Sequence, residues 1–332
     1  MASIHSVVNI GEWKVSTRRG LPPAERADSI MPELQSAFRS RLLLPRDLEQ
    51  TFGGALRYLL DHSGSMVRPR IVYRMASAFK VEKQAAIDLA IALEYFHTAS
   101  LVFDDLPCMD NGSMRRGAPC VHLPYGEAGA ILAALELINR AYALIWRAVS
   151  TCSQATREKA LAYLERHLGT HGLLNGQSLD LHYQALPHTL QSTEQVARGK
   201  TVSLILLTLV LPAMIGGASR RQLQLLERIG ICWGLSYQIL DDLKDVLQSS
   251  SAIGKSAARD EVLDRPNVAL AVGVPAAVER LLRLIAAGDR ALDALLRKGE
   301  RLVFLRDFRG VLTEELNRVI ESAGAVPAAG KR

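Results

Sequence analysis

The sequence predicts an all-α protein, a single-domain antiparallel helical bundle around a deep central cavity. Three observations support this prediction. Apolar residues recur at helical spacing over long stretches, no convincing two-residue alternation of a β-strand is present, and strands do not alternate with helices as they do around a parallel sheet. With 48% hydrophobic and 22% charged residues in 332, the composition is that of a globular protein with ample material for a core. Helices of this length can surround a cavity.

Glycine, proline and breaks in periodicity divide the chain into segments. Residues 1–28 are expected to form a partly ordered arm, 29–322 the helical domain and 323–332 a flexible tail. Helical spacing begins near residue 30, and the loop at 63–70 contains a proline suited to the first turn of the next helix. Further helices are expected over 81–103, 126–150, 157 to about 177, 196–212 and 222–247, near 268, and over 275–297 and 303–322, with a serine-rich loop at 249–256.

The charge balance and the cysteines limit the class of partner. Lys and Arg number 40 against 34 Asp and Glu, a net charge of +6. Nucleic-acid binding is disfavoured because no run of five basic residues occurs and aromatic residues are only 5%, whereas a phosphorylated substrate remains open. The most apolar window, 202–215, is too short to cross a bilayer, so no stable membrane insertion is expected. Four cysteines without a CxxC pair, and no secretory leader, fit a reduced cytoplasmic protein.

Two acidic clusters attract attention because each closes a long apolar helix. The first contains Asp104, Asp105 and Asp110 and is followed by Arg115 and Arg116, and the second contains Asp241, Asp242 and Asp245. Residues four apart, such as Asp241 and Asp245, lie on one helical face. Carboxylates that face a cavity suit Mg²⁺, a hard ion that is commonly shared with substrate phosphates.

A single DDxxD pattern is more often a solvated helix end than a site. Two such patterns in one chain, one of them accompanied by two arginines, are difficult to explain in that way. They predict two acidic walls that face each other across a helical bundle. Between these walls Mg²⁺ would clamp a diphosphate and help it to leave as an anion, while the apolar bundle accepts a hydrocarbon.

Over residues 30–300 the chain resembles the trans-isoprenyl diphosphate synthases, the farnesyl and geranylgeranyl diphosphate synthase family. The resemblance rests on the two aspartate motifs, Asp104-Asp105-Leu-Pro-Cys-Met-Asp110 with Arg115-Arg116-Gly117 and Asp241-Asp242-Leu-Lys-Asp245, and on Gly126-Glu127-Ala128, Gly176-Gln177, Lys200-Thr201, Gln238 and Gly254-Lys255 in the family's order. It implies the isoprenoid synthase (class I terpenoid synthase) fold, a homodimer and Mg²⁺, expected as three ions. It also implies that an allylic prenyl diphosphate ionises and is attacked by isopentenyl diphosphate, which lengthens the chain by five carbons.

The resemblance also assigns roles to individual residues. The residues expected to bind metal are Asp104, Asp105, Asp110, Asp241, Asp242 and Asp245. The allylic diphosphate is expected to be bound by Arg115, Lys200 and Lys255, and its cation to be stabilised by Lys200, Thr201 and Gln238. Isopentenyl diphosphate is expected to be bound by Arg68, His97 and Arg116. Taken singly, histidines such as His97 and His122 are more often structural than functional.

The isopentenyl diphosphate side departs from the family's pattern. A glycine-lysine-arginine element is replaced by Gly64-Ser65-Met66, and the basic residue often found after His122 is Leu123. Each lost charge-assisted bond should weaken diphosphate binding by roughly 1.5–3 kcal/mol, or about ten- to a hundredfold. Chain elongation is the favoured interpretation of the function. The alternatives are a terpene synthase or atypical coupling enzyme of the same fold, and a regulatory partner subunit. A pocket still lined by Arg68, His97 and Arg116 would favour elongation, and an apolar wall would favour cyclisation.

The residues before the first aspartate motif give a partial indication of the length of the product. Ala99 and Ser100 are the fifth and fourth residues before Asp104, and both are expected to point down the cavity that the growing chain enters. A farnesyl-type floor in this family is usually aromatic at these positions. Small residues therefore suggest a deeper cavity, with Phe96 or Tyr95 as a stop, and favour geranylgeranyl diphosphate.

Overall fold

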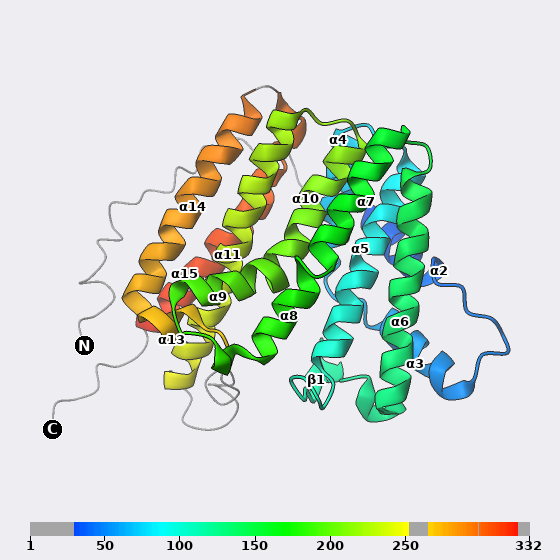
Figure 1. Ribbon diagram of the computed structural model, residues 1–332, viewed down its shortest axis with the longest axis horizontal. Helices are drawn as coiled ribbons and strands as arrows, with labels where there is room; N and C mark the ends of the chain where they lie inside the picture. Colours follow the sequence, from blue (N-terminus) through cyan, green and yellow to red (C-terminus); the bar gives the residue numbers. More distant parts are fainter. Residues whose placement is uncertain (1–29, 252–264, 298, 325–332) are drawn as a thin grey trace. The chain divides into compact units, whose positions relative to one another are not determined.

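The computed structural model describes residues 30–251, 265–297 and 299–324 (Figure 1). In these residues almost all regular structure is helical, with one pair of two-residue strands, so the prediction of an all-α fold is confirmed. The described residues form two compact units. One consists of 30–165 and 207–223, here the N-terminal unit, and the other of 166–206 and the residues from 224 onward, here the C-terminal unit. The boundaries of a single domain at 29 and 322 stay a prediction.

The N-terminal unit is built around one buried helix. Its elements are α2 (Met31–Ser40), α3 (Gln50–Asp61), α4 (Val67–Ala78), α5 (Lys83–Asp104), β1 (Met114–Arg115), β2 (Ala118–Pro119), α6 (His122–Val149), most of α7 (Gln154–Leu168), most of α10 (Ser203–Ile215) and the start of α11 (Arg220–Ser251). Helix α5 packs against α6, α4 and α2, and Figure 1 shows α5 and α6 side by side. The α5 sequence contains no glycine or proline, and its first turn is capped by the Glu82 carboxylate, which accepts from Ala85 N at 2.9 Å. The long helix expected over 81–103 is therefore confirmed.

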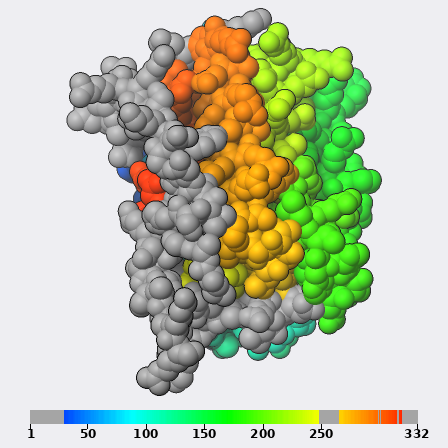
Figure 2. Space-filling view, turned by 90° about the vertical axis from the view of Figure 1, so that its left-hand side faces the viewer, coloured from blue at the N-terminus to red at the C-terminus, as the bar shows by residue number. Residues whose placement is uncertain are grey.

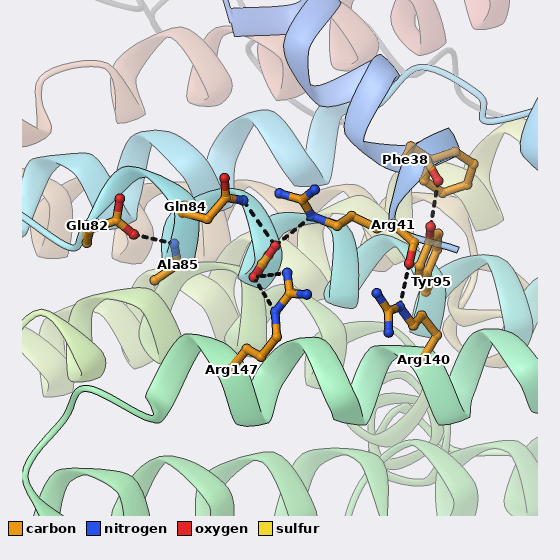
Figure 3. A network of polar contacts seen from close by, with 9 residues as sticks. Phe38, Arg41, Glu82, Gln84, Ala85, Tyr95, Arg140 and Arg147 are labelled. Carbon is orange, nitrogen blue, oxygen red and sulfur yellow. Dashed lines mark hydrogen bonds and ion pairs between the residues drawn. The ribbon is translucent and has the colours of Figure 1, made fainter. Parts of the chain in front are cut away.

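A buried carboxylate joins three helices of this unit (Figure 3). Asp88 on α5 is 2% exposed and accepts from Arg41 Nε, directly after α2, at 2.8 Å and from Arg147 Nε of α6 at 3.0 Å. Gln84 adds a third donor at 3.3 Å. Close by, the Tyr95 hydroxyl donates to the Phe38 carbonyl oxygen at 2.5 Å. A buried carboxylate is tolerated only when donors surround it. Because the donors to Asp88 come from the end of α2 and from α6, these bonds hold both helices against α5.

The segment between α5 and α6 departs from the predicted pattern in two ways. First, the two-residue strands β1 and β2 pair antiparallel and form a short hairpin. Its turn residues, Arg116 and Gly117, both have positive φ (53° and 79°), as hairpin turns that match the strand twist require. Helix α6 begins at His122 rather than near 126, and it is broken at Gly126, whose φ of 71° and ψ of 163° are not helical.

The C-terminal unit follows the predicted helices with different limits. Its elements are α8 (Leu173–Leu181), the 3₁₀ turn η4 (Tyr183–Ala185), α9 (Leu190–Ala197), the π-helix η5 (Arg198–Val202), the start of α10 (Ser203–Ile215), most of α11 (Arg220–Ser251), α13 (Val268–Val272), α14 (Val274–Leu296), the 3₁₀ turn η6 (Glu300–Leu302) and α15 (Leu305–Gly324). The helix expected at 196–212 is three segments that begin at Leu190. Residues 249–251, expected as loop, are helical, and the rest of that loop lies outside the described residues. Figure 2 shows α14, in orange, at the surface of this unit.

Three helical stretches are long and apolar enough to cross a membrane by length and composition alone. They are Lys83–Asp104, Leu190–Ile215 and His122–Val149, and within the most apolar window of each, 78%, 61% and 44% of the residues are buried in the structure. The third stretch, α6, is the one that leaves an apolar stripe at the surface, which is described below.

Candidate active site

The first aspartate cluster lies where α5 ends. Asp104 is the last residue of α5 and Asp105 caps it, and the chain then folds back so that Asp110 N donates to the Asp104 carbonyl oxygen at 2.9 Å. This turn brings Asp104 and Asp110 together as half-buried residues. An added Cβ on Gly112 would lie 2.6 Å from Asp105 Oδ1, so a larger residue here would displace the Asp105 carboxylate. The residues of the predicted first motif are thus gathered by one turn.

Arg115 pairs with this cluster. Its Nη2 lies 2.6 Å from Asp105 Oδ1 and its Nε 3.0 Å from Oδ2, a two-pronged contact with a carboxylate that is only 4% exposed. The hydrogen bonds to Asp105 raise the pKa of the Arg115 guanidinium. The structure therefore gives Arg115, predicted to bind the allylic diphosphate, a second role in holding Asp105.

A pocket of about 420 Å³ lies in the same unit, between α4, α5 and the β1–β2 turn. It is lined by residues 64–68, Glu94, His97 and Arg116. Arg68 Nη1 and His97 Nε2 are 2.9 Å apart, and among the described residues no hydrogen-bond partner reaches the buried Arg68 Nε and His97 Nδ1. The condition that favours elongation is met, because Arg68, His97 and Arg116 still share this pocket. We call it the acceptor pocket.

The acceptor pocket also contains a carboxyl group that the sequence did not single out. Glu94 is 2% exposed and lies 3.3 Å from Arg116 Nη2, while Arg116 Nη1 donates to the His62 carbonyl oxygen at 3.0 Å. Burial raises the pKa of Glu94 to about 7, against the opposing effect of Arg116 and Arg68. Burial also lowers the pKa of His97 well below its usual range, with Arg68 and Arg116 adding to the effect. The available signal was an acidic residue within the apolar run 89–96 of α5.

Replacing Glu94 with glutamine is expected to change how stability depends on pH. The folded protein holds the Glu94 proton up to a pKa of about 7, whereas the unfolded chain releases it near 4.5. This stabilisation is complete below the unfolded pKa and is lost as the pH rises through the folded one, which amounts to about 3 kcal/mol. Urea unfolding between about pH 5 and pH 8 should show Glu94→Gln gaining stability relative to the original protein as the pH rises. Parallel pH profiles for the two proteins would contradict this assignment.

The second aspartate cluster lies on α11 in the C-terminal unit. Asp241 is exposed, Asp245 is half-buried and Asp242 is buried. Both carboxylate oxygens of Asp242 accept hydrogen bonds, Oδ2 from Val268 N at 2.7 Å and Oδ1 from Gln238 Nε2 at 2.9 Å. Asp242 therefore anchors α13 to α11 and orients Gln238, a role that the spacing alone did not indicate.

A chain of hydrogen bonds leads from Asp242 to the Lys200-Thr201 pair. Because Gln238 Nε2 donates to Asp242, its Oε1 accepts from the Thr201 hydroxyl at 2.7 Å. Lys200 Nζ lies 2.8 Å from Asp180 Oδ2, and Arg265 donates from Nη1 to the Asp180 carbonyl oxygen at 2.9 Å. Asp180 and Arg265 are further polar residues beside Lys200 in this unit that the sequence did not indicate.

Local backbone features place Lys200 and Thr201. Both lie in the π-helix η5, a form that adds one residue to the turn and is frequent at functional sites. Helix α8 crosses η5 at two glycines. A Cβ on Gly176 would lie 2.3 Å from Lys200 N, and one on Gly199 2.6 Å from Gly176 Cα. The Gly176-Gln177 motif therefore contains its glycine because two backbones touch there.

The remaining predicted residues are placed as follows. Ala99 is fully buried on α5, and the Ser100 hydroxyl of the same helix donates to the His97 carbonyl oxygen at 2.8 Å. Tyr95 is held by Phe38, and Phe96 meets the Tyr142 ring of α6 at 5.0 Å between centroids. Lys255 lies outside the described residues.

Comparisons with known proteins place the chain among related sequences. Residues 49–292 match the polyprenyl synthetase family. The chain is 34% identical over 256 residues to a chloroplastic geranylgeranyl pyrophosphate synthase of Capsicum annuum, covering 76% of this chain and 69% of that protein. Among solved structures it resembles an apo FPP/GFPP synthase from Zymomonas mobilis (TM-score 0.73, 25% identity, 87% of this chain and 96% of the other). It also resembles a Helicobacter pylori geranyltransferase complexed with magnesium and isoprenyl diphosphate (TM-score 0.70, 23% identity, 92% and 98%), a likeness that concerns the fold.

Proposed function

Because the chain belongs to the polyprenyl synthetase family and is a prenyltransferase, we propose that it condenses an allylic diphosphate with isopentenyl diphosphate, with geranylgeranyl diphosphate as the product. The observation that carries this proposal is the acceptor pocket, in which Arg68, His97 and Arg116 meet. Arg68 can only donate, so His97 Nε2 accepts from it and His97 Nδ1 carries the proton. The buried Arg68 Nε and His97 Nδ1 are therefore both donors that a bound anion could satisfy. Loss of the lysine and arginine at Ser65 and Met66 makes the pocket weaker, with a higher KM for the acceptor.

The proposed reaction divides the work between the residues described above. Lys200 and Arg115 would hold the allylic diphosphate while its C–O bond breaks. The Thr201 hydroxyl donates a hydrogen bond to Gln238 Oε1, so its oxygen lone pairs can stabilise the allylic cation, together with the amide of Gln238 and the backbone at Lys200. The double bond of isopentenyl diphosphate attacks this cation, and loss of a proton gives a chain longer by five carbons.

The aspartates fit Mg²⁺ as the metal. Among the described residues no group of three or more His, Cys, Asp or Glu forms a metal site made of protein alone, and Mg²⁺ is commonly held by one or two carboxylates plus substrate phosphates. The proposed ligands are Asp104, Asp105, Asp110, Asp241 and Asp245, for an expected three ions. Asp242, also predicted as a ligand, is left out of this set because both of its carboxylate oxygens accept hydrogen bonds from Gln238 and Val268. When bound, Mg²⁺ neutralises the diphosphate and helps it to leave.

The proposal is tested by product analysis. Purified protein is incubated with Mg²⁺ and each of dimethylallyl, geranyl and farnesyl diphosphate, with and without isopentenyl diphosphate, and extracts are examined before and after phosphatase treatment. Prenyl alcohols that require isopentenyl diphosphate and phosphatase are the expected result. Hydrocarbons that form without isopentenyl diphosphate would contradict the proposal and indicate a terpene synthase.

Ala99→Tyr should shorten the product. We propose that Ala99 borders the space that the growing chain enters, and a tyrosine ring there would stop the chain at fewer carbons. The measurement is the product distribution by chromatography after phosphatase treatment. Ala99→Ser, which is similar in size to alanine, is the control and should keep the original product. Because extra volume in a packed site costs about 1–3 kcal/mol, thermal unfolding is recorded for both variants. An unchanged distribution from folded Ala99→Tyr would refute this account of the cavity.

We propose that the protein is a homodimer whose subunits meet along α6. An apolar stripe at helical spacing is exposed there, formed by Ile131, Leu132, Leu135, Tyr142 and Trp146, with 37% to 57% of each residue accessible. A continuous stripe of this kind is typical of a contact between chains.

Leu132→Glu combined with Leu135→Glu should convert the dimer to a monomer, because two carboxylates would then be buried at the contact. The molar mass in solution, from light scattering coupled to size exclusion, gives the answer. Leu174→Glu changes another leucine of similar exposure (65%) on α8 and should leave the mass unchanged. A dimer that survives the double substitution would exclude this face.

A further inference from the structure

A second large cleft, of about 930 Å³, lies in the C-terminal unit between α8, α9, η5 and α14. Its volume is in the range of small-molecule sites. Its apolar part is formed by Leu179, Leu190, Val202, Leu206 and Ile231. No step of the proposed reaction uses these residues.

The cleft is lined by other residues of α8 and η5 than those proposed for catalysis. On α8 it is lined by Gly172, Asn175, Gly176 and Leu179, which share one face because they are three and four apart. Asp180, which holds Lys200, points from a different face, about 100° further round than Leu179. On η5 the lining residues are Arg198, Gly199 and Val202, whereas Lys200 and Thr201 do not line it.

The edge of the cleft carries a net positive charge. Arg280 is held by Glu194 through two bonds, Nε to Oε1 at 2.6 Å and Nη2 to Oε2 at 3.0 Å, so these two charges compensate each other. Arg198 approaches Glu194 only to 4.0 Å and keeps its side chain 48% exposed. His167 also lines the cleft, and burial lowers its pKa to about 4, so its imidazole is neutral near pH 7. One guanidinium, that of Arg198, therefore remains as the charge that an anion would meet.

We propose that this cleft binds a single-chain amphiphile with an anionic head group, in which Arg198 contacts the head group and the leucine-rich part holds the chain. The chemistry fits an isoprenoid monophosphate or a fatty carboxylate. No metal is needed, because the positive charge comes from arginine. This is a site additional to the one proposed for catalysis.

The probe is farnesyl phosphate, and its binding to the full-length protein is measured by titration calorimetry in the presence of EDTA, so that no Mg²⁺ is available to the aspartates. One site per chain is expected. Arg198→Gln should weaken binding about tenfold, the effect of losing one charge-assisted bond, while Arg283→Gln, an exposed arginine on α14 outside the cleft, should not. Asn175→Trp should abolish binding by filling the cleft, and Ser178→Trp on the same helix outside the lining should not.

Further binding measurements distinguish this site from the catalytic one and identify the class of ligand. Asp104→Asn and Asp241→Asn should leave metal-free binding unchanged, so failure of the proposed reaction and failure of this site are told apart. Farnesol should bind at least about tenfold more weakly than farnesyl phosphate. Equal binding of hexadecanoate would extend the ligand class to fatty acids, and weaker binding would restrict it to phosphates. No binding in EDTA, binding that both Arg198→Gln and Asn175→Trp leave unchanged, or equally tight binding of inorganic phosphate would overturn the proposal.

Discussion

Asp104→Asn should lower kcat by about 10²–10³-fold, the range found when one preorganised charge-stabilising group is removed from an active site. The substitution keeps the shape of the side chain and removes its negative charge. The proposed Mg²⁺ ligand is then lost, and the diphosphate is a poorer leaving group. Initial rates at saturating substrates over a series of Mg²⁺ concentrations measure the effect. The variant should require more Mg²⁺ for half-maximal rate and should not regain full kcat at saturation.

A matched substitution separates this effect from a general change in charge. Asp47→Asn removes a carboxylate from an exposed loop position of the same unit and should leave both kcat and the Mg²⁺ requirement unaltered. Thermal unfolding of both variants shows whether they are folded. If folded Asp104→Asn kept the original kcat, the first aspartate cluster would have no part in the chemistry.

Asp88→Ala should lower the free energy of unfolding by about 1.5–3 kcal/mol, because it removes the buried carboxylate to which two partly exposed arginines donate. Arg41 and Arg147 both donate to this group, so the loss would also loosen α2 and α6 from α5. Urea unfolding followed by far-ultraviolet circular dichroism measures the change. Asp61→Ala removes the exposed Asp61, 3.9 Å from Arg39, and should cost less than about 1 kcal/mol. A loss below about 1 kcal/mol for Asp88→Ala would mean that this network does not fix the helices.

The parts of the fold that were predictable are those governed by local sequence. Helix α5 was predicted within two residues because nothing in 83–104 interrupts its helical pattern, and its end was predicted because Pro107 cannot continue it. The β1–β2 hairpin was missed because its strands have only two residues each, too few to show alternation. Its turn depends on Arg116, which is not a residue type that normally indicates a positive φ.

The candidate site was predictable in its residue types and less so in its contacts. The spacing of the aspartates identified the two clusters. It could not show that both carboxylate oxygens of Asp242 accept hydrogen bonds from Gln238 and Val268, since Val268 is distant in sequence. The same holds for Glu94 and Asp180, whose partners Arg116 and Lys200 come from other elements. Sequence spacing shows which residues share a helix face, and only the fold shows what they meet.

The π-helix at Arg198–Val202 has a consequence for insertions and deletions. Lys200 and Thr201 owe their direction to one extra residue in the turn, so their placement depends on the number of residues as well as on their identity. Deleting a single residue of this segment other than Lys200 or Thr201 would restore an ordinary α-helical turn and turn the side chains at the bulge by up to about 100° against the helices on either side. Every side chain of the site would survive such a deletion, yet the Thr201–Gln238 hydrogen bond would be lost. The function of this segment should therefore be sensitive to its length as well as to the identity of its residues.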